Sequence, residues 1–367
     1  MTAKPTSEIV LASVPGLGGL YAKGVAATGR LALARRAGHA PTGLADVTYL
    51  AAGVRTDADH LTAYQHLLGE PASDVLPAGF VHVLAFPVAT ALMVRRDFPL
   101  PLLGMVHLAN RVEQHRPVRL DDVLDVRAWA QDLRAHRSGT QVDLVPEVRL
   151  AGDADELGAG PLAWRGVSTY LAKGVHLLDD APPGEVPTGE LPTGGLPGGE
   201  VPDGGGPTGE FVQPTPVRRT ERTNSREGHE LGGARGDGGG VAGAAAGAAD
   251  GTGLVPTGQW RLDGDVGRRY AAVSGDRNPI HLSALSAKPL GFPRAIAHGM
   301  YTASRALADV GAARGEAFTW TVEFAKPLLL PGTPAVRVAH AGDGFAYTVW
   351  HPRTGKVHLS GAVTPLV

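Results

Sequence analysis

The alternation of apolar and polar residues is clearest in the last third of the chain. Apolar side chains recur at helical spacing between residues 297 and 310, which predicts an amphipathic helix with one buried face. Residues 265–274 are expected to form a shorter helix that enters a Gly-Asp turn. Four β-rich runs separated by Gly-containing turns follow the longer helix, at 318–324, 335–341, 345–351 and 357–366. The pattern predicts an α+β domain whose antiparallel sheet wraps around one long helix.

The first half of the chain repeats this plan with weaker motifs. Residues 64–69 echo residues 270–275, and an apolar helix is expected from 80 to 94, with Pro87 kinking it. Strand-like runs again follow the helix, at 106–113, 123–133, 141–150 and 164–171. Two copies of one plan indicate an internal duplication.

A segment of different composition separates the two copies. Residues 180–255 consist mainly of Gly, Pro, Ala, Thr and Glu, and their isolated Val and Leu residues cannot bury enough apolar area to offset the entropy of ordering. We therefore predict a disordered linker between an N-terminal domain, 1–179, and a C-terminal domain, 256–367. A basic patch within the linker, which includes Arg218 and Arg222, is interpreted as a solvated charge cluster.

Composition narrows the possible surroundings and partners. The chain has 367 residues and no cysteine, and the absence of cysteine excludes disulfides and thiolate chemistry. Its net charge of -2 gives no reason to expect nucleic acid as a partner. The sequence shows neither a signal-peptide pattern nor an apolar run of about 20 residues. We expect a cytoplasmic protein that does not insert into membranes.

The densest group of reactive side chains lies in the sequence Tyr-Ala-Ala-Val-Ser-Gly-Asp-Arg-Asn-Pro-Ile-His, residues 270–281. Asp276 and His281 flank a turn and could hydrogen-bond to one water molecule from two directions, acting jointly as general acid and base. Asn278 could orient these hydrogen bonds. Gly299 is expected in the first turn of the long helix, where its free N–H could donate to a carbonyl oxygen that gains negative charge. The group suits a site that moves a proton and a water molecule.

Structural roles compete with these chemical ones. Asp276 could serve as a turn or N-cap residue, because Gly-Asp and Asn-Pro are common turn formers. His298 is interpreted as a buried histidine at the helix start that hydrogen-bonds to the backbone, and Tyr270 as a packing residue. Ser304 is a further, weak candidate for the site.

The same residues, together with His298-Gly-Met300 and the sequence Phe-Ala-Lys-Pro-Leu-Leu-Leu-Pro-Gly at 324–332, resemble the MaoC-like hydratases and dehydratases. The resemblance is to their double hot-dog members and implies a tandem hot-dog fold. It also implies reversible addition of water to a trans-2-enoyl thioester of coenzyme A or acyl carrier protein, giving an (R)-3-hydroxyacyl thioester without metal or redox cofactor. Asp276 and His281 would share the acid–base work, and which of them supplies the proton to C2 stays open. Some relatives carry a hydroxyl residue where this chain has Leu307, and Ser304 is its nearest substitute.

The N-terminal copy lacks the chemical motif. Gly69 is followed by Glu-Pro-Ala-Ser-Asp, and Val83 stands at the place that corresponds to Gly299. We predict a non-catalytic domain that completes a pseudo-dimer, lines one side of the acyl-chain site and helps to bind the pantetheine arm. Two such chains could also form a homodimer. The glycine-rich residues 16–24 lack the spacing of a phosphate-binding loop. No histidine pair has zinc-ligand spacing with a third ligand nearby, so no metal is predicted.

Two other functions remain open at this point. The chain could be a non-catalytic module that binds acyl thioesters, although the intact Asp276, Asn278, His281 and Gly299 argue against it. It could also be a thioesterase of the hot-dog fold, a class that generally lacks this arrangement of Asp, Asn and His.

Overall fold

The structure is a computed structural model that describes residues 5–152, 160–178, 251 and 253–366. The predicted linker, 180–255, lies outside the described residues except for Gly251 and residues 253–255. The predicted domain boundaries therefore stay a prediction.

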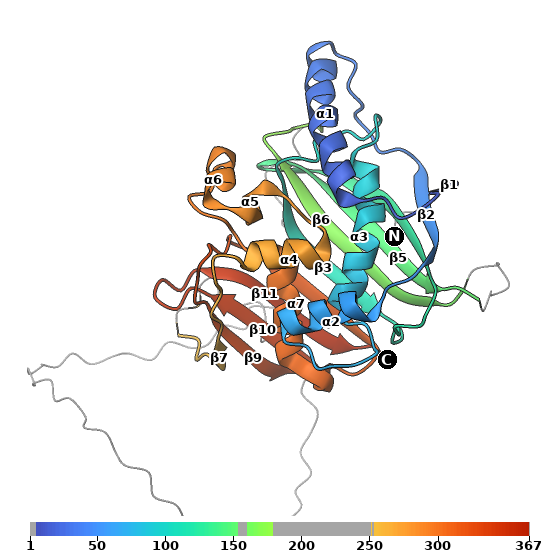
Figure 1. Cartoon of the computed structure of the whole chain (residues 1–367). Helices are drawn as coiled ribbons and strands as arrows, with labels where there is room; N and C mark the ends of the chain where they lie inside the picture. The colour runs from blue at the N-terminus through green and yellow to red at the C-terminus, as the bar shows by residue number, and fades with distance from the viewer. Residues whose placement is uncertain (1–4, 153–159, 179–250, 252, 367) are drawn as a thin grey trace, which may run out of the picture. The chain divides into compact units, whose positions relative to one another are not determined.

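The C-terminal half contains the predicted helix and the predicted meander (Figure 1). Helix α7 (Gly299–Val310) buries the four apolar residues that set its period, Met300, Ala303, Leu307 and Val310. The four predicted strands are confirmed within a few residues as β8 (Phe318–Phe324), β9 (Ala335–Ala341), β10 (Gly344–Trp350) and β11 (Val357–Pro365). The remaining elements are β7 (Gly258–Gln259), α4 (Val266–Ser274), α5 (Pro279–Leu282), α6 (Ala284–Ala287), η1 (Lys288–Leu290) and η2 (Gly311–Arg314).

The N-terminal half contains the four predicted strands as β3 (Met105–Gln114), β4 (Leu124–His136), β5 (Gly139–Leu150) and β6 (Leu162–Lys173). They are preceded by β1 (Ser7–Val10), α1 (Leu17–Arg36), β2 (Val47–Val54), α2 (Ala58–Leu68) and α3 (Ala78–Met93). The pattern of apolar residues did not predict β1, α1 or β2.

Helix α3 corrects one detail of the sequence comparison. It begins at Ala78, directly after the N-cap Pro77, and it contains Pro87. Its first residue therefore corresponds to Gly299 of α7, and Val83 lies in its second turn. The error arose because the helix was expected to begin at residue 80, whereas it already includes the small residues Ala78 and Gly79.

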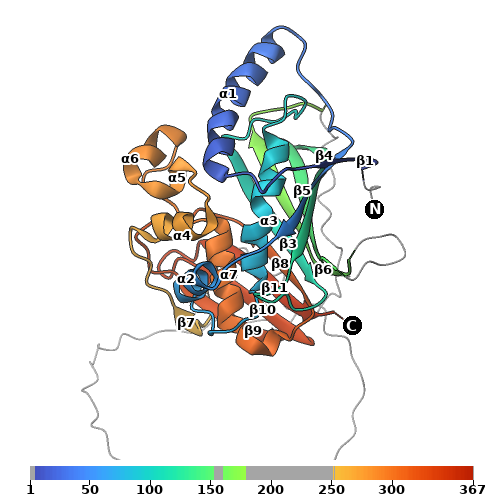
Figure 2. The same cartoon turned by 45° about the vertical axis from the view of Figure 1, so that its right-hand side comes forward.

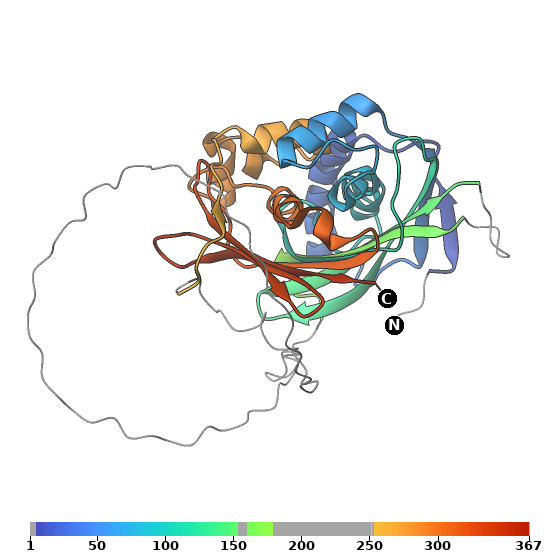
Figure 3. The same ribbon diagram turned by 90° about the horizontal axis from the view of Figure 1, so that it is seen from below.

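The two predicted sheets form one continuous sheet. Its strand order is β1-β2-β4-β5-β6-β3-β8-β11-β10-β9-β7, and the halves are joined by antiparallel pairing of β3 with β8, from Ala109 opposite Glu323 to Gln114 opposite Phe318. Within the described residues, the strands pair antiparallel except at the edge, where β1 runs parallel to β2. Helices α3 and α7 lie side by side against one face of this sheet (Figure 3).

The predicted duplication is visible in matching details of the two halves. Helices α2 and α4 both end at a glycine with a φ of 74°, Gly69 and Gly275, a left-handed conformation that glycine adopts without steric cost. The bridge of Val75 with Arg119 ahead of α3 corresponds to that of Ile296 with Leu329 ahead of α7. The expected tandem hot-dog architecture is confirmed.

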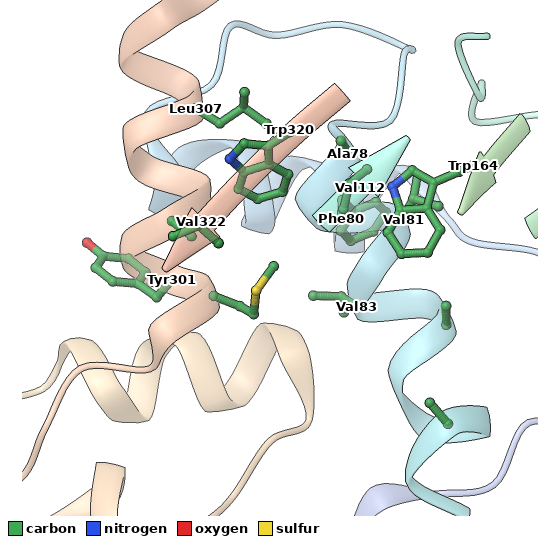
Figure 4. Packing of buried hydrophobic residues seen from close by; sticks show 14 of the residues in the cluster. Ala78, Phe80, Val81, Val83, Val112, Trp164, Tyr301, Leu307, Trp320 and Val322 are labelled. Atoms are coloured by element: carbon green, nitrogen blue, oxygen red, sulfur yellow. The ribbon is translucent and has the colours of Figure 1, made fainter. Parts of the chain in front are cut away.

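One apolar core extends through both halves. Phe80, Val81 and Trp164 from the N-terminal half and Trp320, Val322 and Tyr301 from the C-terminal half belong to a single buried cluster (Figure 4). Within it, the indole N–H of Trp320 donates to the Tyr347 hydroxyl at 2.7 Å. Because the core is shared, the position of each half is fixed by packing against the other.

Candidate active site

Local structure at the C-terminal end of α4 brings the motif residues together. Gly275 ends α4 with a left-handed turn, and Asp276 follows it directly. Asn278 is the N-cap of the short helix α5, whose third residue is His281. His298 is the N-cap of α7. The end of α4, the short helix α5 and the start of α7 thus meet in one region of the protein.

The Asp276 carboxylate is held by two hydrogen bonds to the same oxygen. Its Oδ1 accepts the Tyr21 hydroxyl at 2.5 Å and the backbone N–H of Asn278 at 3.1 Å, while Oδ2 lies 3.8 Å from Nε2 of His298. Burial acts to raise the pKa of Asp276, but the neighbouring His298 and His281 and the two hydrogen bonds outweigh it and hold the pKa below its ordinary value. The group is therefore an ionised carboxylate at neutral pH.

His281 presents a nitrogen with a free lone pair. Its Nδ1 lies 2.9 Å from the carbonyl oxygen of Ile296, and since a carbonyl only accepts, Nδ1 carries the hydrogen and Nε2 is left unprotonated. Burial, reinforced by His298, lowers the pKa of His281 to about 3. The imidazole is neutral at physiological pH and can accept a proton at Nε2.

His298 is buried at the helix start, with an exposed fraction of 3%, and bonds to the backbone as expected. Its Nε2 donates to the carbonyl oxygen of Asp276 at 3.0 Å, and its ring stacks on that of His281 with centroids 3.7 Å apart. This contact fixes the loop that carries Asp276 against the first turn of α7.

Asp276, His281 and His298 also satisfy a geometric condition for metal binding, since each offers a ligand atom within 4.8 Å of the others. The sequence comparison did not find this group, because it considered spacing along the chain alone. The ring stacking opposes coordination: an imidazole nitrogen binds a metal in the plane of its ring, and rings 3.7 Å apart at an interplanar angle of 24° direct their lone pairs along separate planes. The arrangement is better suited to holding water and moving protons.

The other predicted residues have more structural surroundings. The Asn278 side chain accepts the N–H of Ile280 at 3.4 Å and so caps α5, and its backbone N–H orients Asp276. Gly299 is the first residue of α7, where N–H groups have no partner within the helix. Ser304 is buried, and its hydroxyl faces Gly79 and the Tyr64 hydroxyl, at the contact between α7 and α3.

The N-terminal half contributes polar side chains that sequence reasoning missed. Tyr21 of α1 bonds to Asp276, and the charge of Asp276 also acts on Tyr170, His82 and His107. Burial lowers the pKa of His82 to about 4 and, with His82 nearby, that of His107 to about 3. The His107 ring packs between Tyr170 and Phe324. Tyr21 lies in the glycine-rich stretch 16–24, which was considered only as a phosphate loop.

Comparison with known proteins identifies the family of the chain. A model of the MaoC like domain family matches residues 261–358, a span that includes Asp276, His281 and Gly299. The chain is 30% identical over 310 residues to the 3-hydroxyacyl-thioester dehydratase X of Mycobacterium tuberculosis, covering 84% of this chain and 86% of that relative. The chain belongs to the MaoC-like dehydratases.

Solved structures place this MaoC-like dehydratase beside others of the same fold. The crystal structure of HtdX of Mycobacterium tuberculosis matches with a TM-score of 0.61 and 28% identity, over 87% of this chain and 100% of that one. A MaoC-like dehydratase from Phytophthora capsici matches with a TM-score of 0.53 and 17% identity, over 87% of this chain and 95% of that one, and supports the fold alone. Among the described residues, no helix combines the length and apolar character needed to cross a bilayer.

Proposed function

We propose that this protein is a hydro-lyase that interconverts 2-enoyl and (R)-3-hydroxyacyl thioesters. The observation that carries the proposal is the pairing of a neutral His281, whose Nδ1 is tied to the Ile296 carbonyl, with an ionised Asp276. The name of the relative from Mycobacterium tuberculosis, a 3-hydroxyacyl-thioester dehydratase, supports the same substrate class.

The two side chains suit the activation of one water molecule. Ligand atoms of Asp276 and His281 lie within 4.8 Å of each other, a separation that a water hydrogen-bonded to both can bridge. Nε2 of His281 accepts one water hydrogen, and the Asp276 carboxylate accepts the other. The water oxygen then keeps its lone pair for attack on C3.

Proton and charge balance follows from these protonation states. As the C3–O bond forms, the water proton passes to Nε2 of His281, and the resulting imidazolium is stabilised by Asp276. Asp276 is ionised and has no proton to give, so the proton that completes C2 comes from His281. Dehydration uses the same steps in reverse.

The thioester oxygen gains negative charge during this addition. The N–H of Gly299 lies at the positive end of α7, and we assign it as the donor to that oxygen. The substrate is an acyl thioester of coenzyme A or of an acyl carrier protein. The N-terminal half lines the binding site for the acyl chain with the apolar helix α3.

The test is hydration of crotonyl-CoA, followed by loss of enoyl absorbance together with release of free thiol. Absorbance loss without thiol is expected; thiol release would indicate a thioesterase, and neither signal would indicate a binding module. Asp276→Asn and His281→Ala are each expected to lower kcat by at least about 10²-fold.

Matched controls are available on the exposed β9–β10 hairpin. Asp343→Asn and His340→Ala make the same chemical changes at exposed positions and should leave kcat unchanged. A near wild-type rate in either site variant would remove that residue from the mechanism.

A further inference from the structure

Helix α1 reaches the catalytic loop from the opposite end of the sequence. Its first turn packs on the turn that carries Asp276, since a side chain added at Gly275 would lie 2.9 Å from Cδ1 of Leu17. One turn further along α1, the Tyr21 hydroxyl donates to Oδ1 of Asp276 at 2.5 Å. Figure 2 shows this end of α1 beside α3, while the rest of α1 extends away from α3.

Tyr21 is held in place by apolar packing. Leu17 and Leu20 of α1 form a small buried cluster with Ala91 of α3, and Tyr21 itself packs against that cluster. Most of the remaining helix is exposed, including Val25 and Leu33 with exposed fractions of 60% and 66%. The buried face of α1 is thus concentrated at the end that presents Tyr21.

The hydroxyl acts on one carboxylate oxygen and leaves the other available. Oδ1 accepts both Tyr21 and the N–H of Asn278, whereas Oδ2 is the oxygen on the side of His298. Two donors on one oxygen fix the rotation of the carboxylate about its Cβ–Cγ bond. The oxygen that remains can then accept a hydrogen from water.

Other titratable groups surround Asp276, and none of them replaces these donors. Besides Tyr21, the groups that interact with its charge are His298 at the N-cap of α7, His281 of α5, Tyr270 of α4, Tyr170 of β6, His82 of α3 and His107 of β3. Burial lowers the pKa of the four histidines and raises that of the two tyrosines, so all six are uncharged at neutral pH. Among the described residues, the hydrogen bonds to the Asp276 carboxylate come from the Tyr21 hydroxyl and the backbone N–H of Asn278.

We propose that Tyr21 is a positioning residue of the active site, whose hydroxyl orients the Asp276 carboxylate toward the water that is added to the substrate. The inference rests on the proposed function. It gives the N-terminal half, which lacks the catalytic motif, a role in orienting the catalytic carboxylate.

The experiment compares Tyr21→Phe with Tyr49→Phe in the crotonyl-CoA assay. Tyr49 packs against the same apolar cluster, but its hydroxyl contacts Arg95 and does not bond to Asp276. Tyr21→Phe is expected to lower kcat by about 10-fold or more, with a smaller effect on KM, because a hydrogen bond to a charged group is lost. The acid limb of its kcat profile should move to higher pH, since the carboxylate loses a stabilising donor. Tyr49→Phe should change neither quantity.

A double-mutant cycle tests whether Tyr21 acts through Asp276. If it does, Tyr21→Phe combined with Asp276→Asn has the activity of Asp276→Asn alone. Independent, multiplying effects would overturn the inference, as would a Tyr21→Phe enzyme with wild-type kcat and an unshifted acid limb, or one that does not fold. An inactive wild-type enzyme would instead count against the proposed function.

Discussion

The contact between Gly299 and Phe324 makes the start of α7 sensitive to a single methyl group. A Cβ atom at position 299 would lie 3.0 Å from Cε1, 3.1 Å from Cζ and 3.3 Å from Cδ1 of the Phe324 ring. Carbon atoms in favourable contact are about 3.5–4.0 Å apart. Gly299→Ala therefore forces either the ring or the first turn of α7 to move by a few tenths of an ångström.

The cost follows from what surrounds the ring. Phe324 is half-buried, and beyond it lies the His107 ring, with centroids 4.9 Å apart, so the displacement is passed into the site. Overpacking of this kind costs about 1–3 kcal/mol, and we expect the lower part of that range because the ring can yield. Full loss of an oxyanion donor costs about 3–4 kcal/mol, so a displaced donor should lower kcat by about 10-fold to 100-fold.

The assay measures kcat for crotonyl-CoA hydration and the urea unfolding midpoint of the same preparations. Phe324→Leu added to Gly299→Ala removes the obstructing ring and should restore much of both quantities. Gly29→Ala serves as a control, because no atom lies within 4 Å of the added methyl group at that position. Wild-type kcat and stability in Gly299→Ala, or no recovery in the double variant, would refute the steric reasoning.

Two further predictions concern stability. Burial lowers the pKa values of His281, His107 and His82 in the folded chain to about 3, 3 and 4, against an ordinary value of 6.5. The unfolded chain therefore binds more protons than the folded one, and the free energy of unfolding falls as the pH drops below about 6.5. Each histidine lowers the free energy of unfolding at pH 5 by about 2 kcal/mol. Urea unfolding at pH 7 and pH 5 measures this loss, and equal free energies of unfolding at the two pH values would contradict the prediction. Tyr347→Phe should destabilise by about 1–3 kcal/mol with unchanged kcat, because the buried N–H of Trp320 loses its acceptor. An unchanged urea midpoint would show that the indole finds another partner.

The sequence was most informative where a local pattern determines the structure. Strands β8 to β11 were predicted within a few residues, because their side chains alternate and their turns contain glycine. Asp276, Asn278 and His281 are close in the chain, so their proximity in space required only a short turn and α5. Local patterns specify local geometry.

Helix α1 shows why other parts could not be predicted. It contains several glycines, and its buried residues are only Leu17, Leu20, Gly24 and Leu31. Exposed apolar residues such as Val25 and Leu33 obscure the helical spacing of the buried ones. The helix is stabilised by contacts with α3 and with Leu102, against which Gly24 packs closely. The bond from Tyr21 to Asp276 spans 255 positions of the sequence, and it depends on tertiary packing that no short motif encodes.

The pairing of β3 with β8 has a consequence for how the enzyme responds to dilution. Both strands belong to one polypeptide, so the joint between the two halves forms intramolecularly and its occupancy does not depend on protein concentration. A site assembled from two separate chains loses activity per molecule when the chains are diluted below their dissociation constant. Here Tyr21 and Asp276 remain together even in a single isolated molecule.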